Sequence, residues 1–344
     1  MNQPNVSTVC TLAESWKKLP QYSVYLLEGS VMCFGNLLLA ACIFYHPALR
    51  NCKEYFVIAF MFLADALNGS AQLFAAIYRT NLLVFGCHDR LITRWHCMLK
   101  LHSVLWTFSE PCAALMLAVI SFDRLSLLVW PVNYLSNYTM TYISLLLPYL
   151  WSLSSLAVAL GLAYFSASSE LAPQFCLLSS GHGNSYWAYH GTLSVFGALM
   201  SILLFVLFGI LYRKRNSRTQ QHKLSAVSQT LQKQRKLTKS LAYSCFFTLI
   251  FFVIPRAIGT SLYFADLDKS ARASYMMFWY WIVGNINPIL NLFIFTIRHR
   301  EVRAGIRAMF RCEKKAYDLK LWFGPPRKMA LQSKRSNAAD SSNV

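Results

Sequence analysis

Residues 188–212, AYHGTLSVFGALMSILLFVLFGILY, contain no Asp, Glu, Lys or Arg. An α-helix rises about 1.5 Å per residue, so about 20 apolar residues cross the roughly 30 Å hydrocarbon core of a bilayer. This stretch is long enough to cross, and six further stretches meet the same standard. They lie at 22–46, 55–79, 95–129, 140–165, 240–264 and 272–297. The sequence therefore predicts an all-α membrane protein, a bundle of seven transmembrane helices.

The composition favours the same class. Of the 344 residues 56% are hydrophobic and 14% are charged, whereas a soluble domain usually carries about 25% charged residues. The net charge of +19 raises the possibility of nucleic-acid binding. However, the basic residues gather in two segments beside the spans, nine in 213–239 and twelve in 298–335. Basic loops next to spans are typical of the cytoplasmic side, so we expect membrane lipids and no nucleic acid as partners.

Basic residues also predict the orientation of the chain. The segments on the C-terminal side of the membrane hold 24 Lys and Arg, and those on the opposite side hold seven. This bias predicts an extracellular N-terminus and a cytoplasmic C-terminus in the plasma membrane. The sequon Asn5-Val6-Ser7 then lies outside, where Asn5 is a candidate for glycosylation. The expected parts are an extracellular N-terminus at 1–21, the bundle at 22–297, an amphipathic helix at 298–312 and a cytoplasmic tail at 313–344.

The segment after the last span is both basic and amphipathic. Four Arg lie within 298–307, and they alternate with the apolar residues Val302, Ile306 and Phe310. This pattern predicts a short eighth helix that lies on the membrane surface. Cys312 at its end is a candidate for palmitoylation.

Seven helices alone do not separate a receptor from a transporter or channel, so the motifs must decide. The third apolar segment ends in Ser121-Phe122-Asp123-Arg124-Leu125, and Pro131 and Tyr134 follow. This pattern resembles the Asp-Arg-Tyr box and second intracellular loop of rhodopsin-family (class A-like) G-protein-coupled receptors, with Leu125 for Tyr. The resemblance implies that Asp123 holds Arg124 at rest by a charge-assisted bond. Once released, Arg124 would face a G protein. The alternative is that both residues only mark the membrane boundary.

Polar residues in three other spans resemble the same family. They are Asn36 in the first span, Asp65 in the second, and Asn287 with Pro288 in the seventh, where Asn291 replaces the family's Tyr. An ionised Asp in a span costs about 2.5–3.5 kcal/mol or more, so a functional role is the default. The resemblance implies that Asn36, Asp65 and Asn287 form the polar centre of the bundle. Their network is either static or rearranges on activation.

The sixth span departs most from the family. The family's Cys-Trp-x-Pro is replaced by Phe252-Val253-Ile254-Pro255, so the Trp is missing, while Pro255 and its expected kink remain. Arg256 follows directly, and Glu110 lies at a comparable depth, fourteen residues before Arg124. The two charges are placed to face each other. They form either a buried ion pair that fixes packing or a site for a polar or charged ligand.

Aromatic residues near that depth complete the candidate ligand site: Trp106, Tyr263 and Trp281. Trp and Tyr also form interfacial belts or pack the bundle, and both alternatives stay open for each of them. Where the family's amine receptors carry an Asp, this chain has Trp106, which argues against a conventional biogenic amine as the ligand.

Cysteines on the outer side are candidates for a disulfide. Cys97 and Cys176 both face the oxidising side, and Cys87 and Cys10 are competing partners. The family resemblance implies the pair Cys97–Cys176, which would tie the second outer loop over the ligand cavity. The chain has no metal-spaced Cys/His cluster, so we expect neither a metal nor another cofactor.

The resemblance covers about residues 22–312, and the loosened motifs look like those of divergent chemosensory branches such as nematode serpentine chemoreceptors. It implies a receptor that binds an extracellular small molecule or peptide and activates a heterotrimeric G protein. We expect no enzyme, because the chain has no phosphate loop, nucleophile elbow or metal-spaced His/Glu set. The alternatives are a receptor-like protein that does not signal and a transporter, which would typically show inverted repeats or several midplane charges.

Overall fold

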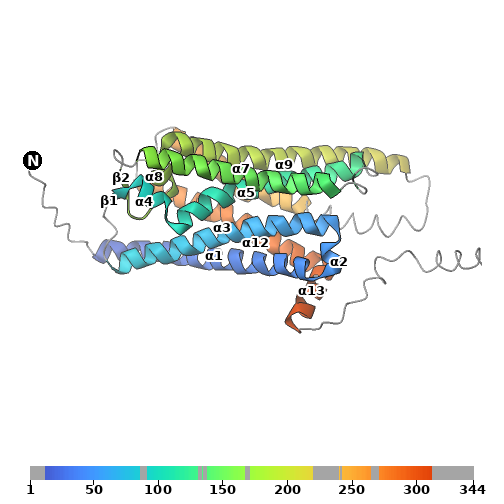
Figure 1. Cartoon of the computed structure of the whole chain (residues 1–344), viewed down its shortest axis with the longest axis horizontal. Coiled ribbons are helices and arrows are strands. Elements are labelled where there is room, and N and C mark those ends of the chain that lie inside the picture. The colour runs from blue at the N-terminus through green and yellow to red at the C-terminus, as the bar shows by residue number, and fades with distance from the viewer. Residues whose placement is uncertain are drawn as a thin grey trace, which may run out of the picture.

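The computed structural model describes residues 12–85, 91–130, 134, 138–166, 171–219, 240, 242–264 and 271–311. Within these residues, seven helices are long and apolar enough to cross a membrane. They run side by side along the long axis of the molecule (Figure 1). The predicted all-α bundle of seven spans is therefore confirmed. Asn5 and Cys312 lie outside the described residues.

The spans follow the chain in order. The first five lie in α1 (Leu12–Tyr45), α3 (Lys53–Val84), α5 (Leu101–Val129), α7 (Tyr138–Phe165) and α9 (Asn184–Thr219). The sixth span, Ala242–Leu262, includes the π-helix η1 (Thr248–Val253) and most of α11 (Ile254–Phe264). The seventh lies in α12 (Ala271–Arg298).

The predicted third segment, 95–129, starts too early. Residues Arg94–Met98 form a separate helix, α4, and the chain then breaks at Leu99 and Lys100. Lys100 has an extended backbone as the N-cap of α5. Cys97 therefore belongs to α4 and not to the third span.

Short elements mark the two ends of the bundle. At one end, which we call the disulfide end, lie α4, α8 (Leu178–His182) and the antiparallel strands β1 (Leu91–Thr93) and β2 (Leu171–Pro173). At the other, which we call the α13 end, lie α2 (Pro47–Arg50) and α13 (Arg300–Phe310) (Figure 1). Helix α13 occupies most of the predicted eighth helix. It buries Val302 and Ala308 and exposes Phe310, and its placement on a membrane surface stays a prediction.

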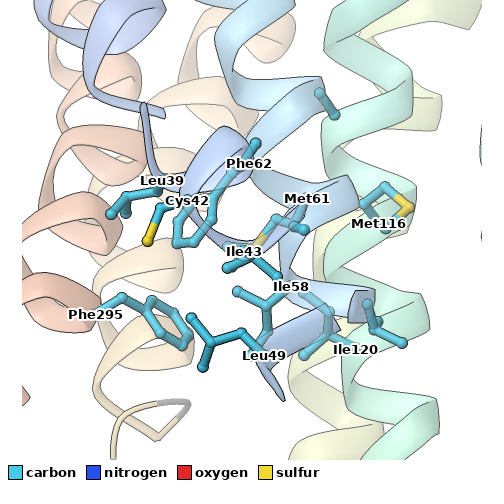
Figure 2. Close-up of a cluster of buried hydrophobic side chains, with 14 of the residues drawn as sticks. Leu39, Cys42, Ile43, Leu49, Ile58, Met61, Phe62, Met116, Ile120 and Phe295 are labelled. Carbon is cyan, nitrogen blue, oxygen red and sulfur yellow. The ribbon is translucent and has the colours of Figure 1, made fainter. Parts of the chain in front are cut away.

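The main apolar core lies toward the α13 end and joins α1, α3, α5 and α12. Figure 2 shows Ile43, Phe62, Met116 and Phe295 meeting there. Lipid offers no hydrophobic drive between helices, so close packing must hold them together. Gly69 permits such packing, because a Cβ added there would lie 2.4 Å from the backbone nitrogen of Cys33 in α1. The side chain of Trp151, in the fourth span, is exposed on the surface of the bundle.

Candidate functional sites at the two ends of the bundle

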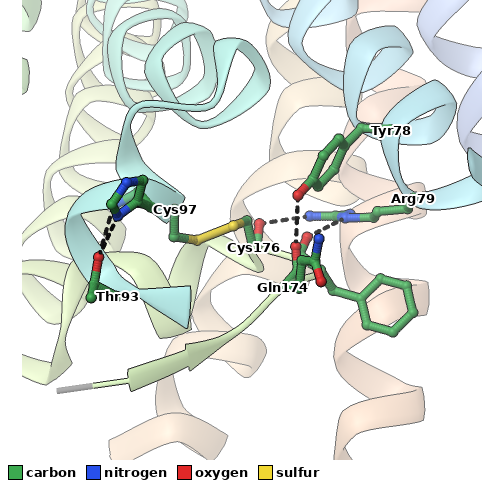
Figure 3. Close-up of a disulfide and its surroundings, with 8 residues drawn as sticks. Tyr78, Arg79, Thr93, Cys97, Gln174 and Cys176 are labelled. Carbon is green, nitrogen blue, oxygen red and sulfur yellow. Dashed lines mark hydrogen bonds between the residues drawn. A yellow bond between two sulfur atoms is a disulfide. The ribbon is translucent and has the colours of Figure 1, made fainter. Parts of the chain in front are cut away.

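A disulfide fixes the loop that covers one end of the bundle. Cys97 of α4 and Cys176, which follows β2, are joined with their Cα atoms 5.2 Å apart (Figure 3). Cys176 has φ +47°, a left-handed conformation that is uncommon for residues other than glycine. Arg79 helps to hold it: Nη2 donates to the carbonyl of Cys176 and Nε to that of Phe175, both at 3.1 Å. The competing partners, Cys87 and Cys10, lie outside the described residues.

Arg79 was counted from the sequence only as a basic residue on the outer side. In the structure it is buried, and its guanidinium lies 5.5 Å from the centre of the Trp106 ring. The buried guanidinium of Arg79 donates to carbonyls of the loop that follows β2. It therefore holds this loop in place in addition to the disulfide. Sequence reasoning missed this role because the partners are backbone atoms, which leave no residue pattern.

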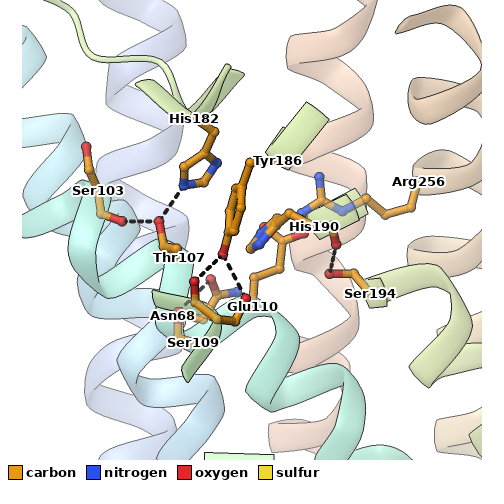
Figure 4. Close-up of polar contacts among 11 residues, drawn as sticks. Asn68, Ser103, Thr107, Ser109, Glu110, His182, Tyr186, His190, Ser194 and Arg256 are labelled. Atoms are coloured by element: carbon orange, nitrogen blue, oxygen red, sulfur yellow. Dashed lines mark hydrogen bonds and ion pairs between the residues drawn. The ribbon is translucent and has the colours of Figure 1, made fainter. Parts of the chain in front are cut away.

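The structure brings Glu110 of α5 and Arg256 of α11 together as an ion pair between Oε1 and Nη2. The other carboxylate oxygen of Glu110, Oε2, lies 3.2 Å from Nε2 of His190 in α9. Figure 4 shows the three side chains meeting inside the bundle. Glu110 and His190 are buried. One carboxylate thus connects three spans. His190 was missed, although it is a polar residue inside the apolar stretch 188–212.

Aromatic rings surround the guanidinium of Arg256. The ring of Trp281 lies 3.5 Å from it, centroid to Cζ. Trp281 in turn stacks on Trp187 at 5.9 Å and lies 5.6 Å from Trp106. Trp281 therefore lies against Arg256 and Trp106 lies against Trp281, while their contact with a ligand stays a prediction. The side chain of Tyr263 lies outside the described ones.

A small cavity opens beside this cluster, between α9, α11 and α12. Its closed space is about 20 Å³, room for about one water molecule. It is lined by Trp187, Gly191, Pro255, Arg256, Gly259, Thr260, Tyr280 and Trp281. Arg256 is the one charged side chain among these lining residues, so it sets the polarity of the space.

His182 at the end of α8 fixes the loop onto the same region. Its Nε2 lies 2.7 Å from the hydroxyl of Thr107 in α5, and that hydroxyl donates to the carbonyl of Ser103 (Figure 4). Because the hydroxyl has a single hydrogen, Nε2 of His182 must be the donor to Thr107. Burial, and to a lesser extent the neighbouring His190, lower the pKa of His182 well below its usual value. The ring is therefore neutral at physiological pH.

At the α13 end, Arg124 is buried between two carboxylates. Nη2 lies 3.0 Å from Oδ2 of Asp123, and Nη1 lies 4.0 Å from Oε1 of Glu54 in the first turn of α3. The Tyr134 hydroxyl donates to Asp123 Oδ1 at 2.7 Å, and Lys53 donates to the Tyr134 carbonyl. Glu54 was missed because an acid at a helix start looks like an ordinary boundary residue.

The sixth span offers Arg124 no acidic partner, since no Asp or Glu occurs between residues 171 and 265. Neutral hydrogen bonds tie this span to the seventh instead. Ser244 donates to Asn291 Oδ1 at 2.6 Å. The single hydroxyl hydrogen of Thr248 is shared between Asn287 Oδ1 at 3.1 Å and the carbonyl of Ser244 at 2.8 Å. We call these two contacts, together with the contact between Ser240 and His299, the hydroxyl ladder.

The third contact of the ladder involves His299, between α12 and α13. Its Nε2 lies 3.2 Å from the hydroxyl of Ser240, and its Nδ1 lies 3.2 Å from that of Tyr55 in α3. Residues 240, 244 and 248 recur every four positions, so they share one helix face. Burial lowers the pKa of His299 to about 4, and its ring is neutral at physiological pH.

Residues 30–310 match the family model described as serpentine type 7TM GPCR chemoreceptor Srsx. The chain belongs to this family. It is also similar to olfactory receptor 13A1 of Homo sapiens, with 23% identity over 328 residues that cover 87% of this chain and 89% of that receptor. The chain is therefore a G-protein-coupled chemosensory receptor and a multi-pass membrane protein, as the loosened motifs indicated.

In this receptor the predicted polar centre is divided. Asn36 donates to the carbonyl of Met32 in its own helix at 2.9 Å, and Asn287 pairs with the sixth span. Asp65 is buried, and no direct hydrogen bond links it to Asn36 or Asn287 in the described part of the chain. The three residues thus lie in the bundle core without forming one directly bonded set.

The two predicted prolines stand at different places in the receptor's helices. Pro255 is the second residue of α11, directly after the π-helix η1, and Pro288 lies inside α12. Proline cannot donate to a carbonyl four residues earlier, and here that carbonyl belongs to Phe251. A Cβ added to Gly284 of α12 would lie 3.7 Å from this oxygen. π-Helical segments are frequent at functional sites. The junction between η1 and α11 is therefore a candidate hinge of the sixth span.

Proposed function

We propose that this chemosensory receptor lies in the plasma membrane with its disulfide end outside, binds its ligand at that end, and activates a heterotrimeric G protein at the α13 end. The excess of Lys and Arg on the C-terminal side, 24 against seven, supports the orientation. The disulfide supports it too, because disulfides persist in oxidising surroundings.

One observation carries the proposal: a single helix, α5, holds a charged residue at each functional end. Glu110 pairs with the sixth span, and Arg124 lies fourteen residues later in the same helix, about 21 Å along its axis. The sixth span is thus tied at the disulfide end by one ion pair and at the α13 end by the hydroxyl ladder. A ligand that disturbs Arg256 changes the balance of both ties.

Activation then takes the form of a population shift. A ligand that binds better to the state with the sixth span displaced outward favours that state. Outward displacement of the sixth span breaks the hydroxyl ladder and opens the surface around Arg124. Arg124 then separates from Asp123 and Glu54 and contacts the G protein. α13 lies on the inner leaflet beside this surface, with Cys312 available for a lipid chain.

The test compares the wild type with Arg124→Ala in cells, at matched surface expression, by G-protein activation across all classes. A matched control is Arg50→Ala, which removes an exposed cation at the same end. We expect basal and stimulated signals from the wild type and the control and none from Arg124→Ala. Equal signals from all three would place coupling elsewhere. A silent wild type under a broad odorant and peptide library would favour the alternative, a receptor-like protein that does not signal.

The orientation has a separate test. The variant Asn5→Gln should lose a glycosidase-sensitive mobility shift that the wild type shows on a gel. If an epitope attached to the N-terminus is instead reached by antibody only after the cells are permeabilised, the proposed orientation is wrong.

A further inference from the structure

The cavity beside α11 has the chemistry of a site for an anion with an apolar body. Arg256 is its one charged lining residue, and Thr260 and Tyr280 add hydroxyl groups. The remaining lining is aromatic rings, Pro255 and two glycines. Glu110 and His190 do not line it. A ligand in this space therefore meets a cation and hydrogen-bond donors but no carboxylate.

The guanidinium of Arg256 has donors to offer. Nη2 is taken by Glu110, whereas Nε and Nη1 make no hydrogen bond to any other residue that the structure describes. The side chain keeps 13% of its surface exposed, against 3% for Glu110. A guanidinium presents paired N–H groups that match the two oxygens of a carboxylate.

Glu110 has the arrangement needed to give up Arg256. Its second oxygen lies 3.2 Å from Nε2 of His190, and the hydroxyl of Ser194 lies on the same face of α9 as His190 (Figure 4). If a second carboxylate takes over Arg256, Glu110 still has His190 as a partner. Removing one member of a buried ion pair is otherwise strongly unfavourable.

The neighbours of His190 leave this partnership undisturbed. The groups facing it are the carboxylate of Glu110 and the rings of His182, Tyr186 and Trp187, at centroid distances of 5.5–6.2 Å. In the described part of the chain Glu110 is the one acid that contacts it. A neutral ligand could not replace Glu110 on Arg256, because the guanidinium would then lose its counter-charge.

We propose that the ligand is a small monocarboxylate with an apolar or aromatic body, and that its carboxylate replaces Glu110 on Arg256. This inference rests on the proposed function, because it places the ligand in the same site. The exchange transfers the guanidinium from α5 to the ligand. It thereby releases the tie between α5 and the sixth span, and one proton taken up from solution and held between Glu110 and His190 balances the second carboxylate.

The space limits the size of the ligand. A Cβ added to Gly191 would lie 3.2 Å from the Thr260 hydroxyl, so the walls already approach each other closely. The stacked rings of Trp187 and Trp281 close another side. The closed space has room for a group of about the size of a water molecule, about 20 Å³, so the carboxylate is the part that enters it and a small body is the one that displaces the walls least.

The experiment measures binding to the purified full chain in lipid nanodiscs. The probes are butanoate, hexanoate, octanoate, benzoate and phenylacetate, each beside its primary amide, which has the same shape without the charge. We expect carboxylates to bind the wild type, and the amides to bind more weakly by on the order of 10- to 100-fold. Arg256→Gln should weaken carboxylate binding by a similar factor.

Two further variants keep the proposal falsifiable if Arg256→Gln does not fold. Glu110→Gln removes the competing charge, so it should bind carboxylates several-fold more tightly. Gly191→Val fills the cavity without touching a charge and should abolish binding, whereas the exposed control Trp279→Phe should not change it.

The proposal is overturned if no carboxylate of the panel binds, if the amides bind equally well, or if Glu110→Gln leaves the affinity unchanged. Its failure can be told apart from failure of the proposed function. Carboxylate binding without G-protein activation keeps the ligand class and contradicts the function. Activation through Arg124 by neutral molecules alone keeps the function and contradicts the ligand class.

Discussion

The hydroxyl ladder should restrain the receptor at rest. In the double variant Ser244→Ala, Thr248→Val, the sixth span loses the donors to Asn291 and Asn287. Both changes remove a hydroxyl from a buried position and add no bulk. If the sixth span moves outward on activation, these bonds exist only in the resting state, so their loss destabilises that state alone.

The magnitude follows from the two bonds. A buried hydrogen bond contributes about 1 kcal/mol net, so the double variant shifts the resting-to-active equilibrium by about 2 kcal/mol. That is a factor of about 30. If the active state holds about 1% of the wild-type population at rest, it should rise to about a quarter.

The assay is basal nucleotide exchange by a G protein, measured without ligand at equal surface expression. The control Ser154→Ala removes a hydroxyl that bonds only its own helix in α7 and should match the wild type. Adding Arg124→Ala to the double variant should abolish the gain. A double variant whose basal activity stays within about twofold of the wild type would refute the view that the ladder is a resting-state restraint, since the expected factor is about 30.

Three further predictions concern the loop and Arg124. Glu54→Gln removes the more distant of the two carboxylates on Arg124, so basal activity should rise by only about two- to threefold in the same exchange assay; a fall would contradict this role. The lowered pKa of His182 means that its contribution to stability is complete above about pH 6.5 and declines as pH falls below that value. The melting temperature should therefore drop between about pH 7.5 and about pH 5.5, and by less in His182→Gln; identical drops would assign the effect to other groups. Cys176→Ser opens a cross-link between residues 79 apart in sequence and should lower stability by up to about 4.5 kcal/mol, seen as reduced surface expression and melting temperature. The control Cys112→Ser, at a buried free cysteine, should lower both by less.

The seven spans were predictable because apolar length alone decides whether a segment can cross a bilayer. The start of the third span was not. Two residues, Leu99 and Lys100, break the helix without changing the average hydropathy of the segment. Cys97 was therefore placed in α5, although it belongs to α4.

The facing of Glu110 and Arg256 was also predictable, because charges inside spans seldom face lipid and tend to pair. His190 was not, since a single His in an apolar run is usually a core residue. Glu54 was hidden among boundary charges. Both become visible only when helices far apart in sequence are packed together.

The hydroxyl ladder shows why the half of the bundle toward the α13 end was harder to predict. Ser and Thr in spans commonly bond their own helix carbonyls, as Thr248 also does with Ser244. The pattern gave no sign that Asn291, standing where the family has Tyr, is the acceptor for Ser244. The sequence singled out Asn287 and Asn291 as special positions but could not supply their partners in the sixth span.

The most direct test of the account is the distance between α5 and the sixth span at the α13 end. Spin labels would be introduced as non-canonical amino acids at Val129 and Ala242, which are both exposed, in the full chain in nanodiscs. We predict one short distance in the wild type, and a second, longer distance when Glu110→Gln is combined with Ser244→Ala and Thr248→Val. An unchanged single distance in that variant, with G-protein activation nevertheless raised, would contradict the claim that the two ties hold the sixth span at rest.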